Sequence, residues 1–184
     1  MQNIFSEIET LRQAAPIVIG VNGLDCAGKT TFAKALYDDM RRRDVTCRLL
    51  HIDDYNNLAV QKQVYEAHQR QVFNAALLDL YYQDSIDYQT AAQAILSSRK
   101  DYDVTLIEGV FLFKDCLAPL LDIKVFLSVD PDTARDRYAK RRIQVGDRRL
   151  PSVFDDIWLP AFRRYCDEVQ PADICDLTYG QCEE

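Results

Sequence analysis

Residues 23–30 constrain the fold of this chain more strongly than any other segment. Two glycines in this segment bracket four other residues, and a lysine and a threonine follow at once. This spacing lets successive backbone N–H groups point at phosphate oxygens. An apolar run, 17–21, precedes the segment, and apolar side chains recur every three or four positions in residues 30–43. The pattern predicts a phosphate-binding loop between a buried strand and an amphipathic helix.

The loop supplies several groups that suit the phosphates of a nucleotide and their metal ion. Gly23 and Gly28 permit positive φ angles and a close approach of the backbone to the phosphates. Lys29 brings a positive charge, and the Thr30 hydroxyl is placed to ligate Mg2+ where the following helix presents the positive end of its dipole. The residues predicted to contact ATP are Gly23, Asp25, Cys26, Ala27, Gly28, Lys29, Thr30 and Thr31.

Short apolar runs alternate with longer segments of helical period along the rest of the chain, which is typical of a parallel sheet covered by helices. The expected strands are 17–21, 47–52, 104–107, 125–129 and 174–177. The expected helices are 30–43, 60–80, 90–96, 131–143 and 153–169, with Asp130 as a cap and a break at Pro160. We therefore predict one domain, residues 1–184, with a three-layer α/β/α fold and a mostly parallel five-stranded sheet.

The net charge of −7 argues against a protein that coats nucleic acid or an anionic membrane. The six cysteines include no C-x-x-C pair, so reduced thiols are expected and no disulfide framework. Residues 1–15 mix charged with isolated apolar side chains, unlike a signal peptide, and no run approaches the about 20 apolar residues that span a membrane. A cytoplasmic protein without nucleic-acid or membrane partners is expected.

Acidic residues follow two of the expected strands, at the edge where open α/β folds bind ligands. Asp53 and Asp54 end the second apolar run, where they either cap a turn or face the phosphates. Glu108 follows the third run, in the position of an acid that ligates magnesium through water. The sequence thus predicts a magnesium site at Thr30 and Glu108, with an acidic base beside it.

Basic side chains concentrate in residues 135–149, which carry seven Arg and Lys against two Asp. A charge run commonly forms a solvated helix face, and this interpretation stays open for most of these residues. Arg137 and Arg141 differ, because their four-residue spacing puts both on one helix face, from which they can stabilise charge on a transferring phosphoryl group. Gly146 offers a flexible point, so residues 135–150 are expected to form a lid.

In their order along the chain, these motifs resemble those of the uridine kinase-like P-loop kinases, a group that also includes phosphoribulokinase and pantothenate kinase. The matching segments are the loop and residues 53–55, 108–112, 160–162 and 172–174. The resemblance implies an ATP- and Mg2+-dependent kinase that phosphorylates a hydroxyl group of a small molecule, in the first place a nucleoside.

The resemblance also implies roles for single residues. Asp53 matches the catalytic base of that group, and Glu108 matches its Walker B acid. The implied catalytic residues are Lys29, Asp53, Arg137 and Arg141. The implied acceptor-binding residues are Asp53, Tyr55 and Tyr88.

Two alternatives stay open. The loop through Thr31 also resembles that of thymidylate kinases, which phosphorylate a nucleotide, although their Asp-Arg-aromatic motif follows strand three and residues 136–138 here follow strand four. A nucleotide-binding regulatory protein without catalysis is the other alternative. A GTPase is disfavoured, because neither an N-K-x-D motif nor a D-x-x-G motif after the third strand is present.

The sequence does not identify the acceptor. Tyrosines at 55, 65, 81, 82 and 88 can either stack on a base or fill a core. His68 is expected on a helix surface, and no heptad or repeat indicates an oligomeric state.

Overall fold

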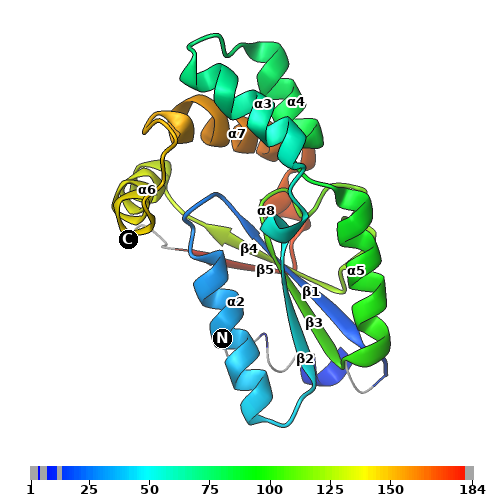
Figure 1. Ribbon diagram of the computed structural model, residues 1–184. Coiled ribbons are helices and arrows are strands. Elements are labelled where there is room, and N and C mark those ends of the chain that lie inside the picture. Colours follow the sequence, from blue (N-terminus) through cyan, green and yellow to red (C-terminus); the bar gives the residue numbers. More distant parts are fainter. Residues whose placement is uncertain (1–3, 5–7, 12–13, 181–184) are drawn as a thin grey trace.

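The computed structural model describes residues 4, 8–11 and 14–180 and shows a five-stranded sheet in which every strand pair is parallel (Figure 1). In spatial order the strands are β2 (Cys47–His51), β3 (Val104–Gly109), β1 (Ile17–Gly23), β4 (Ile123–Ser128) and β5 (Leu177–Gly180). β1 lies in the centre, paired with β3 on one side and β4 on the other. The carboxyl ends of all five strands therefore lie at the same edge of the sheet.

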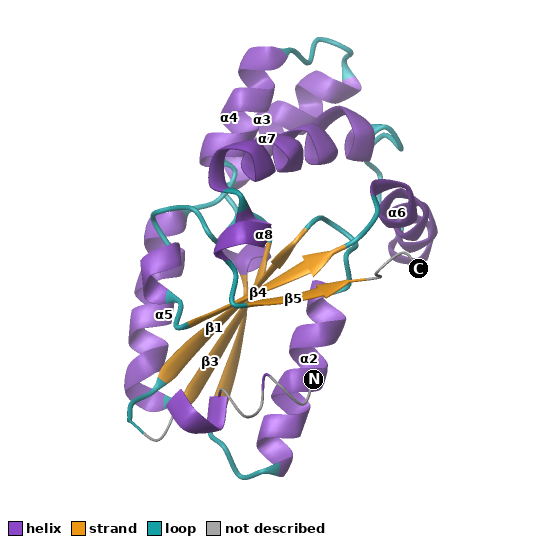
Figure 2. Cartoon of the chain, turned by 180° about the vertical axis from the view of Figure 1, so that it is seen from behind, coloured by secondary structure: helices purple, strands orange, loops and turns teal. Residues whose placement is uncertain are grey.

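Helices cover both faces of the sheet, because buried strands direct apolar side chains to both sides in turn. Val18 of β1 belongs to one apolar core and its neighbour Ile17 to the other. α2 (Lys29–Arg42) packs on the face of Ile17, whereas α5 (Tyr88–Asp101) packs on the face of Val18 (Figures 1 and 2). α7 (Leu159–Val169) contributes to the same apolar core as Val18. The predicted α/β/α fold with a parallel five-stranded sheet is confirmed.

The single helix expected at 60–80 was wrong, because this region forms two helices. They are α3 (Leu58–Gln69) and α4 (Ala75–Asp84), and α4 also packs against α7 beyond one end of the sheet (Figure 1). The side chain of Asn74 accepts a hydrogen bond from the Leu77 N–H and so caps the start of α4. An asparagine cap begins a new helix even where the apolar period continues.

The region 153–169 contains the expected irregularity near its proline. Phe154–Trp158 forms a π-helical turn in which the Leu159 N–H bonds to the Phe154 carbonyl, five residues earlier. Pro160 lacks an N–H, so it cannot close the usual helical bond at the next position. The expected strand 174–177 was placed too early, because Pro171–Ile174 is the short helix α8 and β5 begins only at Leu177.

The segment predicted to form a lid, residues 135–150, begins within α6 (Pro131–Val145). The Asp130 carboxylate accepts a hydrogen bond from the Thr133 N–H, so the predicted cap is confirmed. Gly146 has a φ of 64° and ends α6 in the left-handed conformation that glycine adopts most easily. α6 lies at the edge of the sheet where the strands end (Figure 1) and leads into the segment 147–153.

Cys26, Cys47, Cys116, Cys166 and Cys175 are all free thiols, as expected, while Cys182 lies outside the described residues. Within the described residues, no helix is both long and apolar enough to cross a membrane. Part of the segment 1–15, in which no signal peptide was expected, also lies outside the described residues.

Gly109 ends β3 directly against Ile52, and this contact yields a prediction about stability. A Cβ atom at Gly109 would lie 1.9 Å from Ile52 Cγ2 and 2.5 Å from Ile52 Cβ. We expect Gly109→Ala to lower the free energy of unfolding by about 1–3 kcal/mol, because the backbone must move to relieve the overlap. Gly20→Ala is the control, since its Cβ would meet only the flexible end of Leu121, at 2.6 Å. Urea unfolding that finds Gly109→Ala as stable as the parent protein contradicts this prediction.

Candidate active site

The phosphate loop joins β1 to α2 and turns its backbone through two left-handed residues. Cys26 has a φ of 63° and Gly28 a φ of 97°, so the N–H groups between them point toward one side. Gly23 is not in this conformation, so the positive φ allowed for it is not adopted. Gly23 instead allows close packing between strands, because a Cβ there would lie 2.6 Å from the carbonyl oxygen of Leu127 in β4.

Lys29 and Thr30, the first residues of α2, connect the loop to β3. The Lys29 side chain is buried, and its Nζ donates a hydrogen bond to the Leu24 carbonyl at 2.8 Å. The Thr30 hydroxyl donates to Glu108 Oε1 at 2.9 Å. His51 at the end of β2 contacts the same oxygen through Nδ1 at 2.7 Å. The ends of β2 and β3 and the start of α2 therefore meet at one carboxylate.

The Glu108 carboxylate lies in the wall of a cavity of about 690 Å³, which we call the phosphate cavity. The structure brings together here all the predicted phosphate-loop residues except Gly23, together with the predicted base, the acid and both lid arginines. The residues concerned are Asp25, Cys26, Ala27, Gly28, Lys29, Thr30, Thr31, Asp53, Glu108, Arg137 and Arg141.

The donor set of the phosphate cavity fits a magnesium ion. Thr30 offers a hydroxyl oxygen and Glu108 a carboxylate oxygen, and the two groups lie within hydrogen-bonding distance. Mg2+ prefers oxygen ligands and keeps several waters, so one or two protein groups beside phosphates suffice. Thr30 and Glu108 are therefore the residues that would hold it.

The arginines of the predicted lid divide into two groups by what they contact. Arg135 forms ion pairs with Asp132 and Asp155. Arg142 donates to the carbonyls of residues 147 and 149 and so stabilises the chain after α6. Arg137 instead donates to the Cys26 carbonyl in the phosphate loop at 3.3 Å, and Arg141 lines the phosphate cavity. The four-residue spacing of Arg137 and Arg141 therefore distinguished the two arginines that face the loop from Arg135 and Arg142, whose contacts are structural.

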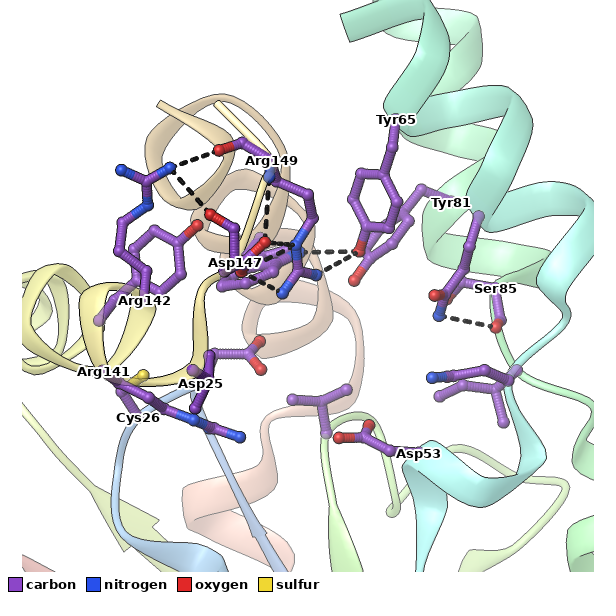
Figure 3. Close-up of a pocket in the computed structure, with 17 residues that line it drawn as sticks. Asp25, Cys26, Asp53, Tyr65, Tyr81, Ser85, Arg141, Arg142, Asp147 and Arg149 are labelled. Carbon is purple, nitrogen blue, oxygen red and sulfur yellow. Dashed lines mark hydrogen bonds and ion pairs between the residues drawn. The ribbon is translucent and has the colours of Figure 1, made fainter. Parts of the chain in front are cut away.

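A second, smaller cavity of about 130 Å³, the inner cavity, adjoins the phosphate cavity and lies between the loop, the lid and helices α3 and α4 (Figure 3). The two cavities share a set of lining residues, namely Asp25, Cys26, Asp53, Val110 and Arg141. A group in the inner cavity would therefore lie next to a group in the phosphate cavity.

Asp53 stands at the junction of the two cavities, in the turn Ile52–Tyr55 that follows β2. Although the cavities leave its surface accessible, protein surrounds the carboxylate on several sides. Burial raises the pKa of Asp53, and the negative charges of Asp25 and Glu108 raise it further, against the opposing effect of Lys29 and Arg141. A raised pKa makes a carboxylate a stronger base.

The far wall of the inner cavity is a polar and aromatic network that the sequence analysis missed. Asp147 holds the Arg149 guanidinium through an ion pair at 2.6 Å, and that guanidinium lies 4.6 Å from the ring centre of Trp158. The Trp158 indole N–H donates to the Tyr65 hydroxyl at 3.1 Å. Asp147 and Arg149 were visible in the sequence only as members of a charge run.

The structure brings Tyr65 and Tyr81 to the inner cavity, but it does not bring the two tyrosines that were predicted there (Figure 3). Tyr55 and Tyr88 line neither cavity and instead pack against the apolar core under α5. The surface position expected for His68 was wrong as well, because its ring is buried and contacts Asp156 Oδ2 through Nε2 at 2.8 Å.

A third cavity, of about 440 Å³, lies on the other side of the loop between α2 and β5. Its walls are mostly apolar and include Phe32 and Tyr179, whose ring centres are 5.1 Å apart. Thr31 and Arg137 line both this cavity and the phosphate cavity. A flat ring with attached phosphates could therefore extend from one to the other.

Comparison with curated proteins finds relatives along most of the chain. Uridine kinase from Ligilactobacillus salivarius is 25% identical over 87% of this chain and 87% of its own length. Uridine kinase from Lactiplantibacillus plantarum is 28% identical over 85% of this chain and 82% of its own length. The chain resembles uridine kinases. No family model matches the chain, so the resemblance rests on these pairwise similarities and on the order of the motifs.

Solved structures confirm the fold of this uridine kinase-like chain. A possible uridine kinase from Bacillus stearothermophilus superposes with a TM-score of 0.64 at 20% identity, covering 96% of this chain and 99% of that one. A putative fructose transport system kinase from Silicibacter sp. TM1040 gives a TM-score of 0.60 at 14% identity, covering 96% and 97%. At these identities the likeness concerns the fold alone.

The position of Asp53 leads to a prediction that compares two neighbouring acids. Asp53 lines both cavities, whereas Asp54 lines neither. We expect Asp53→Asn to lower turnover by about 10²- to 10⁴-fold, the usual range for loss of a general base, with ATP still bound. Asp54→Asn is the control and should change turnover much less.

The pH dependence of kcat/KM provides a second readout of Asp53. Because a base acts in its ionised form, activity should fall as the pH drops through the raised pKa of Asp53. The Asp53→Asn variant should lack this acidic limb. If Asp54→Asn proves the more damaging change, the base has been assigned to the wrong carboxylate.

Proposed function

We propose that this protein is an ATP-dependent kinase that transfers a phosphoryl group to a hydroxyl of a nucleoside. One observation carries the proposal: the Asp53 carboxylate lies where a phosphate cavity and a smaller polar cavity meet. Phosphoryl transfer requires the acceptor hydroxyl, a base and the terminal phosphate to lie side by side. The curated relatives named uridine kinase support both the kinase reaction and the nucleoside acceptor.

In this proposal ATP lies across two cavities. Its phosphates occupy the phosphate cavity, where Lys29 carries a positive charge and the loop residues Cys26 and Gly28 turn the backbone N–H groups. The base fits against Phe32 and Tyr179, which both line the apolar cavity beside α2. Mg2+ held by Thr30 and Glu108 would neutralise phosphate charge.

Different residues of the chain then carry out different parts of phosphoryl transfer. Asp53 orients the acceptor hydroxyl and accepts its proton. Lys29, Arg137 and Arg141 stabilise the charge on the phosphoryl group, since all three line the phosphate cavity. Closure of α6 over the loop excludes water from the site.

The charges of the inner cavity favour a neutral acceptor over a nucleotide. A monophosphate needs a cation that is free to bind it. Asp147 already engages Arg149, and Arg142 already donates to two backbone carbonyls. Arg141, the remaining arginine of this cavity, also lines the phosphate cavity, where the donor nucleotide is proposed to lie. This arrangement supports a nucleoside kinase against a thymidylate kinase-like enzyme.

A turnover screen separates the three candidate functions. The purified protein is incubated with Mg-ATP and, one at a time, with ribonucleosides, nucleoside monophosphates, pantothenate and sugars. Phosphorylation of nucleosides supports the proposal, whereas phosphorylation of monophosphates alone supports the thymidylate kinase-like alternative. ATP binding without turnover of any acceptor supports a regulatory nucleotide-binding protein.

Lys29 provides a direct test of the phosphate site. We expect Lys29→Ala to lower turnover by on the order of 10²-fold or more, because a charge that stabilises the transition state is lost. Lys34→Ala is the matched control, since Lys34 lies exposed on the same helix and lines none of the three cavities of the site. Unchanged turnover in Lys29→Ala, measured on the best acceptor, argues against the kinase.

The lid arginines provide a further test. Arg141→Ala and Arg137→Ala should each depress kcat while the melting temperature stays close to that of the parent, because both side chains are exposed and exposed charges add little stability. Arg148→Ala, an exposed arginine of the same segment, is the control and should affect neither quantity. An Arg141→Ala variant that unfolds, or that turns over normally, returns this arginine to a structural role.

A further inference from the structure

Asp25 holds an unusual position inside the phosphate loop. It lines both the phosphate cavity and the inner cavity. Figure 3 shows the carboxylates of Asp25 and Asp53 pointing toward the same space from opposite sides, one from the loop and one from the turn after β2. A negative charge in a loop that surrounds phosphates is unfavourable on its phosphate side. On the side of the inner cavity, the same carboxylate can instead accept hydrogen bonds from a bound group.

Neither of these two carboxylates is committed to another described side chain. The ion pairs and side-chain hydrogen bonds of the lid involve Asp132, Asp147 and Asp155 but not Asp25 or Asp53. Their oxygens therefore remain available as acceptors within one cavity. Such oxygens require donors from whatever fills the cavity.

The opposite wall of the inner cavity supplies a neutral phenol. Tyr81 is almost fully buried, and its hydroxyl points into the cavity beside that of Tyr65 (Figure 3). Burial raises the pKa of Tyr81 well above its ordinary value, and the charges of Asp25 and Asp53 contribute to that rise. The phenol therefore stays protonated and adds no charge opposite the two carboxylates.

We propose that Asp25 is an acceptor-binding residue that accepts a hydrogen bond from a second hydroxyl of the sugar, while Asp53 accepts one from the hydroxyl to be phosphorylated. Hydroxyl groups are donors that a pair of carboxylates can share without an additional cation. The volume of the inner cavity, about 130 Å³, suits a group of sugar size. This inference rests on the proposed nucleoside kinase and narrows its substrates to nucleosides that carry the second hydroxyl.

The test compares acceptors that differ by one hydroxyl. Binding of uridine, 2′-deoxyuridine and 3′-deoxyuridine is measured by calorimetry in the parent protein and in Asp25→Ala, and kcat/KM is measured for each acceptor. In the parent, we expect one deoxy analogue to be weaker than uridine by on the order of 10- to 100-fold, the usual effect of a hydrogen bond to a charged group. Asp25→Ala should weaken uridine by a similar factor and change that deoxy analogue by less than about threefold.

Controls separate this role from others in the same loop. Asp25→Asn keeps the size of the side chain and should restore part of the uridine preference, because an amide oxygen still accepts a hydrogen bond. The contacts predicted between this loop and ATP come from backbone N–H groups, which both substitutions keep. Binding of a fluorescent ATP analogue should therefore change less than binding of uridine in both variants. Thermal melting confirms that the variants are folded.

Two results overturn the inference. If Asp25→Ala weakens uridine and both deoxy analogues equally, Asp25 does not contact a second hydroxyl, although the kinase assignment stands. If Asp25→Ala weakens only the binding of ATP, Asp25 likewise does not contact a second hydroxyl of the acceptor. If the parent protein binds none of the four common ribonucleosides, the inference fails together with the nucleoside part of the proposed function.

Discussion

The parallel pairing of β1 with β3 on one side and β4 on the other is the constraint on which the active site depends. It brings the ends of β1, β2 and β3 to one edge of the sheet, so that loops far apart in sequence begin side by side. The loop of Lys29, the turn of Asp53 and the carboxylate of Glu108 all arise at this edge. The hydrogen bond from Thr30 to Glu108 then links the start of α2 to the end of β3.

Close packing at this edge leaves little freedom to the backbone. Gly23 lies against the backbone of β4, and Gly109 lies against Ile52, the residue before Asp53. A side chain at either glycine would displace a segment that carries a proposed catalytic group. The buried Asn22 amide donates to the Tyr165 hydroxyl, which also accepts from the Phe113 N–H, so β1, α7 and the segment after β3 are fixed to one another. Rigid supports of this kind favour a preorganised site.

The sequence analysis found the part of the site that local patterns determine. The spacing in the phosphate loop, the position of Asp53 after one strand and that of Glu108 at the end of another follow from chain order and from the rule for parallel sheets. The four-residue spacing of Arg137 and Arg141 likewise follows from helix geometry. For these residues a correct strand assignment was sufficient to place them at the same edge.

The lining of the inner cavity, where the acceptor is proposed to bind, could not be predicted in this way. Tyr65 and Trp158 lie 93 residues apart and meet through a hydrogen bond that depends on how α3 packs near the π-helical turn. The break between α3 and α4 at Asn74 lets α4 pack back against α3 and against α7, which a single continuous helix could not do. Tyr88 was expected at the acceptor, but α5 directs it into the core. Tertiary packing, which local periodicity does not encode, decides these positions.

One consequence of this packing is that the far wall of the inner cavity is connected to α6, the helix of the proposed lid. α6 continues into Asp147 and Arg149, and Arg149 lies over both Tyr65 of α3 and Trp158. The buried His68, one turn beyond Tyr65 on α3, contacts Asp156 of the π-helical turn. α3 and the segment that follows α6 are thus joined by an aromatic contact and by a polar one. In the proposed kinase, a movement of α6 that brings Arg141 toward the phosphates would also move this wall of the inner cavity, so closure over ATP and the fit of the acceptor are expected to depend on each other.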